Sequence, residues 1–110
     1  MTEGNWKVAE GAFRANLAHL MAKQGELDPA FDLLDEAEQL VREAHVETWM
    51  GVLALRAELA LDIGRSGLAQ QQVETLKTVF EEHGRPNDLL RLRKRMPSTL
   101  LELVERVFST

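Results

Sequence analysis

The feature that most constrains this chain is an internal repeat, because the sequence matches itself when it is shifted by 39 residues. Residues 15–30 and 54–69 both read A-x-x-A-x-L-x-x-x-x-G-x-x-x-x-A, and large apolar residues at helical spacing follow each copy. Repeats with a period of about 20–50 residues indicate stacked supersecondary units. Each copy therefore predicts a helix, a glycine turn and a second helix. The alternative is a chance likeness between two alanine-rich helices.

Small residues have defined roles in such a unit. Alanine at a helix crossing lets two antiparallel helices approach closely. Glycine at the turn, here Gly25 and Gly64, adopts backbone conformations that other residues resist. We therefore expect the glycines to serve backbone geometry and the repeated alanines to serve packing.

Apolar residues recur at spacings of three and four along the whole chain, and strand patterns are essentially absent. This spacing predicts helices over residues 6–24, 29–44, 47–63, 68–83, 88–95 and 99–108. We expect Asp28 before Pro29 to cap the second helix, Asn87 to cap the fifth, and Thr99 with Glu102 to form a capping box for the last. One face of the first helix is predicted to hold the apolar residues Ala9, Phe13, Leu17, Leu20 and Met21.

Composition bounds the class of protein. The chain has 110 residues, of which 45% are hydrophobic and 28% charged, as expected for one globular domain. It has no cysteine, which excludes disulfides, thiol catalysis and thiolate metal sites. No run approaches the roughly 18 apolar residues of a membrane span, so no membrane association is expected. The first ten residues lack the pattern of a signal peptide, which predicts a cytoplasmic protein.

Candidate catalytic residues are few. The only histidines, His19, His45 and His83, lie in separate segments, and none has the spacing of a metal motif. We expect His83 to lie at the carbonyl end of the fourth helix and His45 in a solvated turn. No glycine-rich phosphate loop or nucleophile motif is present. The sequence therefore predicts a protein that is not an enzyme and binds no cofactor or metal.

Charge is unevenly distributed along the chain. Residues 26–47 hold eight acidic side chains and one basic side chain, whereas residues 85–95 hold five basic and one acidic. We define the basic patch as Arg91, Arg93, Lys94 and Arg95. Three roles are open for such a patch. It is a solvated helix face or neutralises the acidic second helix, or it contacts a protein partner. In the third role it contacts nucleic-acid phosphates. No aromatic residue is interleaved for base stacking and the chain is acidic overall, which disfavours nucleic acid.

Residues 15–37 resemble a tetratricopeptide repeat (TPR). The first copy has Gly25, then Ala30 and Ala37 at the alanine positions of that family, with Leu34 at the large position between them. The second copy keeps Ala69 but has Leu76 at the later alanine position. The period exceeds the usual 34 or so residues and is closer to the long-helix variety of bacterial regulatory proteins. The resemblance implies an all-α fold in which antiparallel hairpins stack as a TPR-like superhelix of two repeats.

In tetratricopeptide proteins, the first helix of each repeat lines a concave surface that binds peptides. The resemblance therefore implies a partner-binding groove, lined by Asn16, His19 and Lys23 from the first copy and by Glu58 and Asp62 from the second. Basic and acidic groups at different ends of this groove would suit a peptide that carries both charges. The alternative is that these are ordinary exposed residues.

The predicted organisation is a single domain over residues 1–110, with repeat one at 6–44, repeat two at 45–84 and C-terminal capping helices at 85–110. The last helix gathers large apolar residues on one face, which a solvated monomer rarely leaves uncovered. This face docks on the fourth helix as a cap, packs against a second chain in a dimer, or does both. Its members are Leu100, Leu103, Val104, Val107 and Phe108.

The function expected from these features is non-catalytic protein–protein interaction, as an adaptor, chaperone-like or regulatory module that binds a protein or peptide. The alternative is a homo-oligomerisation or assembly domain, with a possible homodimer. A third hypothesis is a nucleic-acid-associated regulator that uses the basic patch.

Overall fold

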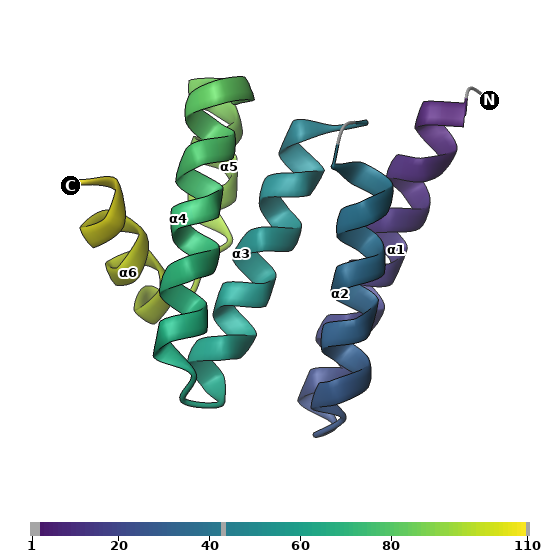
Figure 1. Cartoon of the computed structure of the whole chain (residues 1–110), viewed down its shortest axis with the longest axis horizontal. Coiled ribbons are helices and arrows are strands. Elements are labelled where there is room, and N and C mark those ends of the chain that lie inside the picture. The colour runs from purple at the N-terminus through teal and green to yellow at the C-terminus, as the bar shows by residue number, and fades with distance from the viewer. Residues whose placement is uncertain (1–2, 43, 110) are drawn as a thin grey trace. The chain divides into compact units, whose positions relative to one another are not determined.

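The computed structural model describes residues 3–42 and 44–109, and in these residues it contains six α-helices and no strand (Figure 1). The chain divides into two compact units, Met1–Val52 and Leu53–Thr110, and the border falls inside the third helix. The helices are α1 (Glu3–Lys23), α2 (Leu27–Val41), α3 (Val46–Asp62), α4 (Ser66–His83), α5 (Pro86–Lys94) and α6 (Ser98–Phe108).

All six predicted helices are present, which confirms the all-α class. Their ends differ from the prediction where a capping residue was inferred from sequence. Helix α2 begins at Leu27, two residues early, so that Glu26 occupies the N-cap position and makes no side-chain cap bond. Asp28 and Pro29 lie inside the first turn. The predicted end of this helix at residue 44 passes through position 43, which lies outside the described residues.

The caps of the two C-terminal helices also differ from the prediction. Helix α5 begins at Pro86, so Asn87 does not cap it; instead the Asp88 carboxylate accepts a hydrogen bond from the Arg85 amide at 3.1 Å. Helix α6 begins at Ser98 with Pro97 at the N-cap, which places Thr99 inside the helix. The predicted capping box of Thr99 and Glu102 is therefore wrong. In both cases proline, which is favoured in the first turn or before it, fixes an earlier start.

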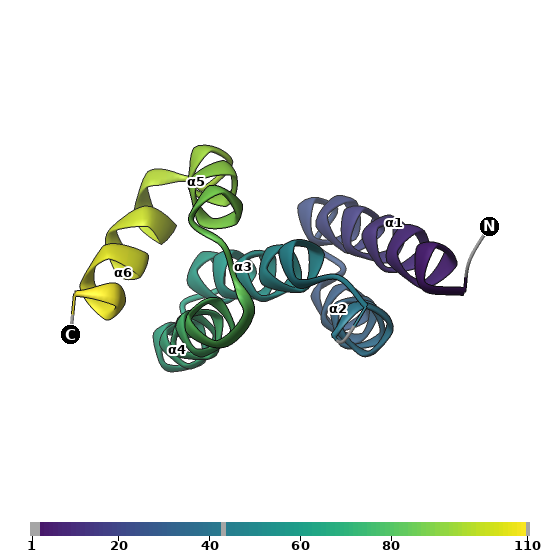
Figure 2. The same cartoon turned by 90° about the horizontal axis from the view of Figure 1, so that it is seen from above.

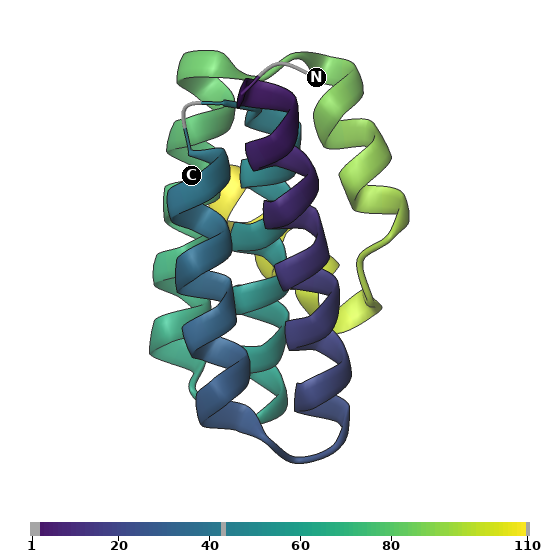
Figure 3. The same ribbon diagram turned by 90° about the vertical axis from the view of Figure 1, so that its right-hand side faces the viewer.

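In the first unit α1 packs antiparallel to α2 (Figure 3). The helices touch most closely at Gly11, which is buried: a Cβ atom there would overlap Val41 Cγ1 and lie 3.3 Å from the Ala37 carbonyl oxygen. Ala18, about two helical turns further along α1, is also fully buried. At the edge of the crossing, the Arg14 guanidinium forms ion pairs with Glu10 and with Glu36 of α2. Small residues on α1 thus allow the helix axes to approach.

The two hairpins close through turns of identical construction. In the first, Gly25 has φ 85°, its amide bonds the Ala22 carbonyl at 3.0 Å, and the Glu26 amide bonds the Met21 carbonyl at 2.9 Å. In the second, Gly64 has φ 78° and the corresponding bonds are Gly64 to Leu61 at 3.1 Å and Arg65 to Ala60 at 2.8 Å. This pattern is the Schellman motif, which requires a left-handed residue. The expectation that both glycines serve backbone geometry is confirmed.

In the second unit α4 lies between the second half of α3 and α6. A hydrogen bond of 2.8 Å from Arg56 Nη1 to Gln72 Oε1 joins α3 to α4. On its other side α4 packs against α6, where the rings of Phe80 and Phe108 lie 6.1 Å apart. Figure 2 shows the bend that leads from α5 into α6. The core of this unit includes the fully buried side chains Ala57, Ala60, Ala69, Val73, Leu76 and Leu100.

Two helical glycines test the close crossing of α1 and α2. Gly11→Ala should destabilise the fold by about 1–3 kcal/mol, because its new methyl group meets Val41 and the backbone of Ala37. Gly51→Ala, in the middle of α3, meets nothing within 4 Å and should stabilise the fold by about 0.5–1 kcal/mol through helix propensity. Urea unfolding followed by circular dichroism measures both. Equal effects of the two substitutions would contradict a close crossing at Gly11.

The left-handed turn is tested by a second pair of glycines. Gly64→Ala should cost about 1–2 kcal/mol, since alanine is strained at a positive φ whatever space surrounds it. Gly67 lies three residues on, in the first turn of α4, and does not have a positive φ. Gly67→Ala is therefore the control and should leave stability unchanged or slightly raised. A Gly64→Ala protein that unfolds at the parent urea concentration would argue against the strained turn.

Candidate functional site

Three of the predicted groove residues lie on one face of α1, spaced three and four residues apart. Asn16 and Lys23 are exposed, and His19 is half-buried. A face with one amide and one ammonium group in water can donate several hydrogen bonds to an acidic or carbonyl-rich ligand. In the first unit, α1 therefore presents a polar face.

The other two predicted groove residues lie on the part of α3 that belongs to the second unit. Asp62 is exposed at the end of the helix, and Glu58, one turn earlier, is half-buried. Their spacing of four places both carboxylates on one helix face. This face is acidic, in contrast to the polar face of α1.

An exposed apolar stripe on α1 is the largest surface feature that capping and packing do not explain. Its members Trp6, Phe13 and Leu20 are 53%, 62% and 58% exposed, and Leu17 lies beside them. We call these four residues the α1 stripe. The apolar residues do share one face, as predicted, but that face is not the one that packs on α2. Gly11 and Ala18, which do face α2, lie on the opposite side of the helix at about 100° per residue.

The sequence argument could have found this arrangement from the small residues. Gly11, Ala15, Ala18 and Ala22 recur at spacings of three and four, which is the period of a helix face. A face of glycine and alanine contributes little hydrophobic area, so a search for large apolar residues passes over it. The packed face of α1 is the one with the smallest side chains.

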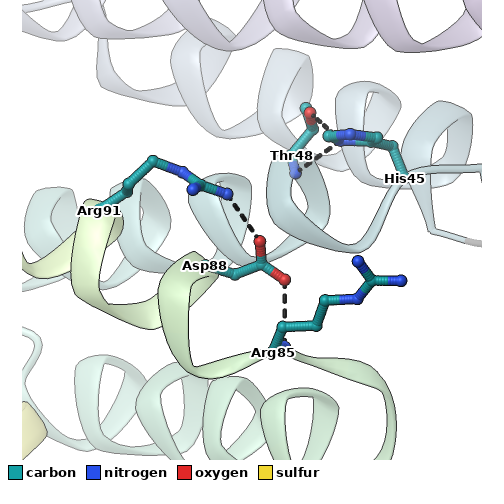
Figure 4. Close-up of polar contacts among 5 residues, drawn as sticks. All are labelled: His45, Thr48, Arg85, Asp88 and Arg91. Carbon is teal, nitrogen blue, oxygen red and sulfur yellow. Dashed lines mark hydrogen bonds and ion pairs between the residues drawn. The ribbon is translucent and has the colours of Figure 1, made fainter.

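His45 is exposed in the turn before α3, as predicted, and it also caps that helix. The Thr48 amide donates a hydrogen bond to His45 Nδ1 at 3.2 Å, and Thr48 Oγ1 lies 2.7 Å from the same nitrogen (Figure 4). The imidazole thereby satisfies one of the backbone donors that a helix leaves open at its start. In the next turn, Trp49 Nε1 donates to Glu38 Oε2 of α2 at 3.1 Å, and the Arg42 guanidinium lies over the Trp49 ring.

Two of the four cations in the basic patch have carboxylate partners. Arg91 Nη2 lies 2.8 Å from Asp88 Oδ1 within α5 (Figure 4), and Arg93 Nη2 lies 2.9 Å from Glu105 Oε1 of α6. Lys94 and Arg95 are exposed at the end of α5, where positive charge is favourable beside the helix carbonyls. The Arg93 pair joins the two C-terminal helices, so part of this patch has a structural role.

The apolar face of α6 is turned toward α4. Leu100, Leu103 and Val104 are buried, whereas Val107 and Phe108 are half-buried. Lys77 of α4 donates a hydrogen bond to the Val107 carbonyl at 3.4 Å, and Phe108 contacts Phe80. A shallow depression of about 270 Å³ lies beside this contact, between Leu89, Val104 and Phe108. In the second unit α6 thus covers the apolar side of α4, as the capping hypothesis requires.

One buried charge was missed by the sequence argument. Arg56 of α3 is only 7% exposed and is the one charged residue buried in the described part of the chain. A buried cation must be paired or hydrogen-bonded, and Gln72 of α4 meets part of that requirement. The repeat aligns Arg56 with Leu17, an apolar residue, so the alignment could not indicate a buried arginine.

The described residues contain no group of three or more histidine, aspartate or glutamate side chains placed to hold a metal ion. Among the same residues, no helix has the length and apolar character that crossing a membrane requires.

Leu100 tests the contribution of α6 to the second unit. Leu100→Ala should destabilise the protein by about 2–5 kcal/mol, because it removes a fully buried side chain and leaves a cavity. Leu90→Ala on α5 is the matched control: that leucine is 54% exposed and its loss should cost little. Thermal unfolding by calorimetry measures both. A Leu100→Ala protein that melts with the parent would contradict the docking of α6 on α4.

No model of a protein family, no curated protein and no solved structure matches this chain. The resemblance to tetratricopeptide repeats therefore stays a prediction from the residues of the two copies. What the chain does has to be inferred from the surfaces described above.

Proposed function

We propose that the chain is a non-catalytic protein–protein interaction module, in which two TPR-like hairpins present their first helices to a protein or peptide partner. The observation that carries the proposal is the identical Schellman turn built twice, at Gly25 and Gly64, in register with the 39-residue repeat. Stacked repeats of a helical hairpin commonly form extended binding surfaces. A TPR-like superhelix is part of this proposal.

The charges on the first helices of the two hairpins favour a ligand of mixed charge. Lys23 is the last residue of α1 and is exposed. Asp62 is the last residue of α3 and is the residue that aligns with Lys23 one repeat on. A basic residue in one repeat and an acidic residue at the same place in the other would each attract the oppositely charged end of a bound peptide. Charge arranged in this way contributes specificity and register more than affinity.

The hydrogen-bonded side chains described above have structural roles. The Thr48 hydroxyl lies 2.7 Å from His45 Nδ1, and the same nitrogen accepts a hydrogen bond from the Thr48 amide, so this pair caps α3. Arg91 and Arg93 of the basic patch are paired with carboxylates, which favours a structural role over phosphate binding.

The proposal can be tested with a peptide array. Labelled protein is applied to peptides that carry acidic residues at one end and basic residues at the other, with charge-scrambled peptides beside them. Retention of the mixed-charge peptides is expected. Lys23→Glu and Asp62→Lys should each weaken it about tenfold, equivalent to about 1.4 kcal/mol. Glu81→Lys, on the exposed side of α4, makes the same charge change as Asp62→Lys and is its control, which should have no effect.

Two results would count against this function. Equal loss of binding in the Glu81→Lys control would indicate a response to net charge alone. Retention of DNA or RNA that falls with salt, and falls further in Arg95→Glu, would instead favour the nucleic-acid hypothesis, since salt-dependent binding is typical of phosphate contacts.

A further inference from the structure

The α1 stripe exposes two aromatic and two leucine side chains along a single helix face. Trp6, Phe13 and Leu20 recur at a spacing of seven residues, and Leu17 lies between the last two. These side chains together expose on the order of 400 Å², taking about 150–250 Å² for a whole aromatic side chain. Exposed apolar patches of this size on a protein often mark an interaction site.

The internal repeat shows what happens to the same positions in a covered helix. Phe13 aligns with Val52 and Leu20 with Leu59, and these two residues of α3 are 1% and 3% exposed. Leu17 aligns with Arg56, which is also buried. The face that is buried in α3 is thus exposed in α1, where Phe13 and Leu20 are 62% and 58% exposed. In the first copy this face is also more apolar than in the second.

We propose that the α1 stripe is the interface of a homodimer, in which the α1 helices of two copies pack antiparallel about a two-fold axis at Phe13. The spacing of the stripe is symmetric about that residue. The axis places Trp6 of one copy opposite Leu20 of the other, and Phe13 opposite Phe13. It also places Leu17 opposite the small residue Ala9, so that large and small side chains alternate.

The charge distribution suits contact through this face. Helix α1 carries three basic and two acidic residues, whereas residues 26–47, which include α2, hold eight acidic side chains and one basic side chain. Helix α2 lies on the side of α1 opposite to the stripe, since it packs on Gly11. Antiparallel pairing through the stripe therefore keeps the two acidic α2 helices apart and avoids like-charge repulsion.

The area predicts a weak dimer. Two stripes bury about 800 Å² between them, and neighbouring residues such as Ala9 and Gln24 add to this, which approaches the lower end of specific interfaces at about 1,200 Å². Such an interface is expected to give a dissociation constant in the micromolar range. The inference goes beyond the proposed function, because self-association through the stripe requires no peptide partner and none of Lys23, Glu58 or Asp62.

Sedimentation equilibrium of the full chain, from about 5 to 500 μM, tests the dimer. The parent should shift from monomer to dimer across this range. Phe13→Glu should weaken association at least tenfold, while Leu90→Glu, at the exposed leucine of α5, should leave it unchanged. Because Phe13 is exposed, both variants should keep the helical circular dichroism of the parent. A parent that stays monomeric at 500 μM, or equal weakening in both variants, would overturn the proposal.

Disulfide trapping tests the orientation, and the natural absence of cysteine makes it unambiguous. Trp6→Cys and Leu20→Cys chains are mixed at high concentration under mild oxidation. Antiparallel packing predicts a mixed disulfide between the two variants and little cross-linking of either variant alone. Cross-linking of Trp6→Cys with itself would indicate parallel helices and contradict the two-fold arrangement. The absence of any cross-link above that of a Leu90→Cys control would also contradict it.

Discussion

The hairpins of this protein depend on a turn that glycine alone makes without strain. At Gly25 and again at Gly64, a positive φ lets the chain reverse within a few residues while the last carbonyls of the helix remain hydrogen-bonded. So short a turn holds two helices side by side from their first shared turn onward. The helices then approach closely only where their side chains are small, and this condition decides which face of the first helix packs.

In the first hairpin that condition turns the large side chains of α1 outward. Gly11 and Ala18 form the contact with α2, because a single added methyl group at Gly11 would already overlap Val41. Phe13 and Leu20 are then left on the far side of the helix. In the second unit, the apolar side of α4 that faces away from α3 is not exposed to water. Helix α6 covers it, through Leu100 and the contact of Phe108 with Phe80. The apolar side chain of Leu100 on α6 is therefore buried, whereas Phe13 on α1 is exposed.

Sequence periodicity was sufficient for the helices and for the turns, because spacing and glycine position are local properties. The helix starts were less predictable. Asp28 and Asn87 are good capping residues by type, but Pro29 and Pro86 fall inside first turns, and the carboxylate that caps α5 comes from Asp88. The burial of Arg56 could not be predicted, since it depends on which helix lies beside that face. The exposure of Phe13 could have been inferred, because the small residues of α1 mark the opposite face as the packed one.

The comparison of Leu17 with Arg56 shows that the two copies differ in burial as well as in sequence. The repeat aligns these residues, yet the arginine is buried while the leucine lies in the exposed stripe. In a monomer with no other contact, the hydrophobic effect would favour a buried leucine and an exposed arginine. Arginine is tolerated at its position because Gln72 accepts a hydrogen bond from it. Leucine at the exposed position stabilises the protein only when another apolar surface covers it. In the proposed dimer, the α1 stripe of the second copy would provide that surface.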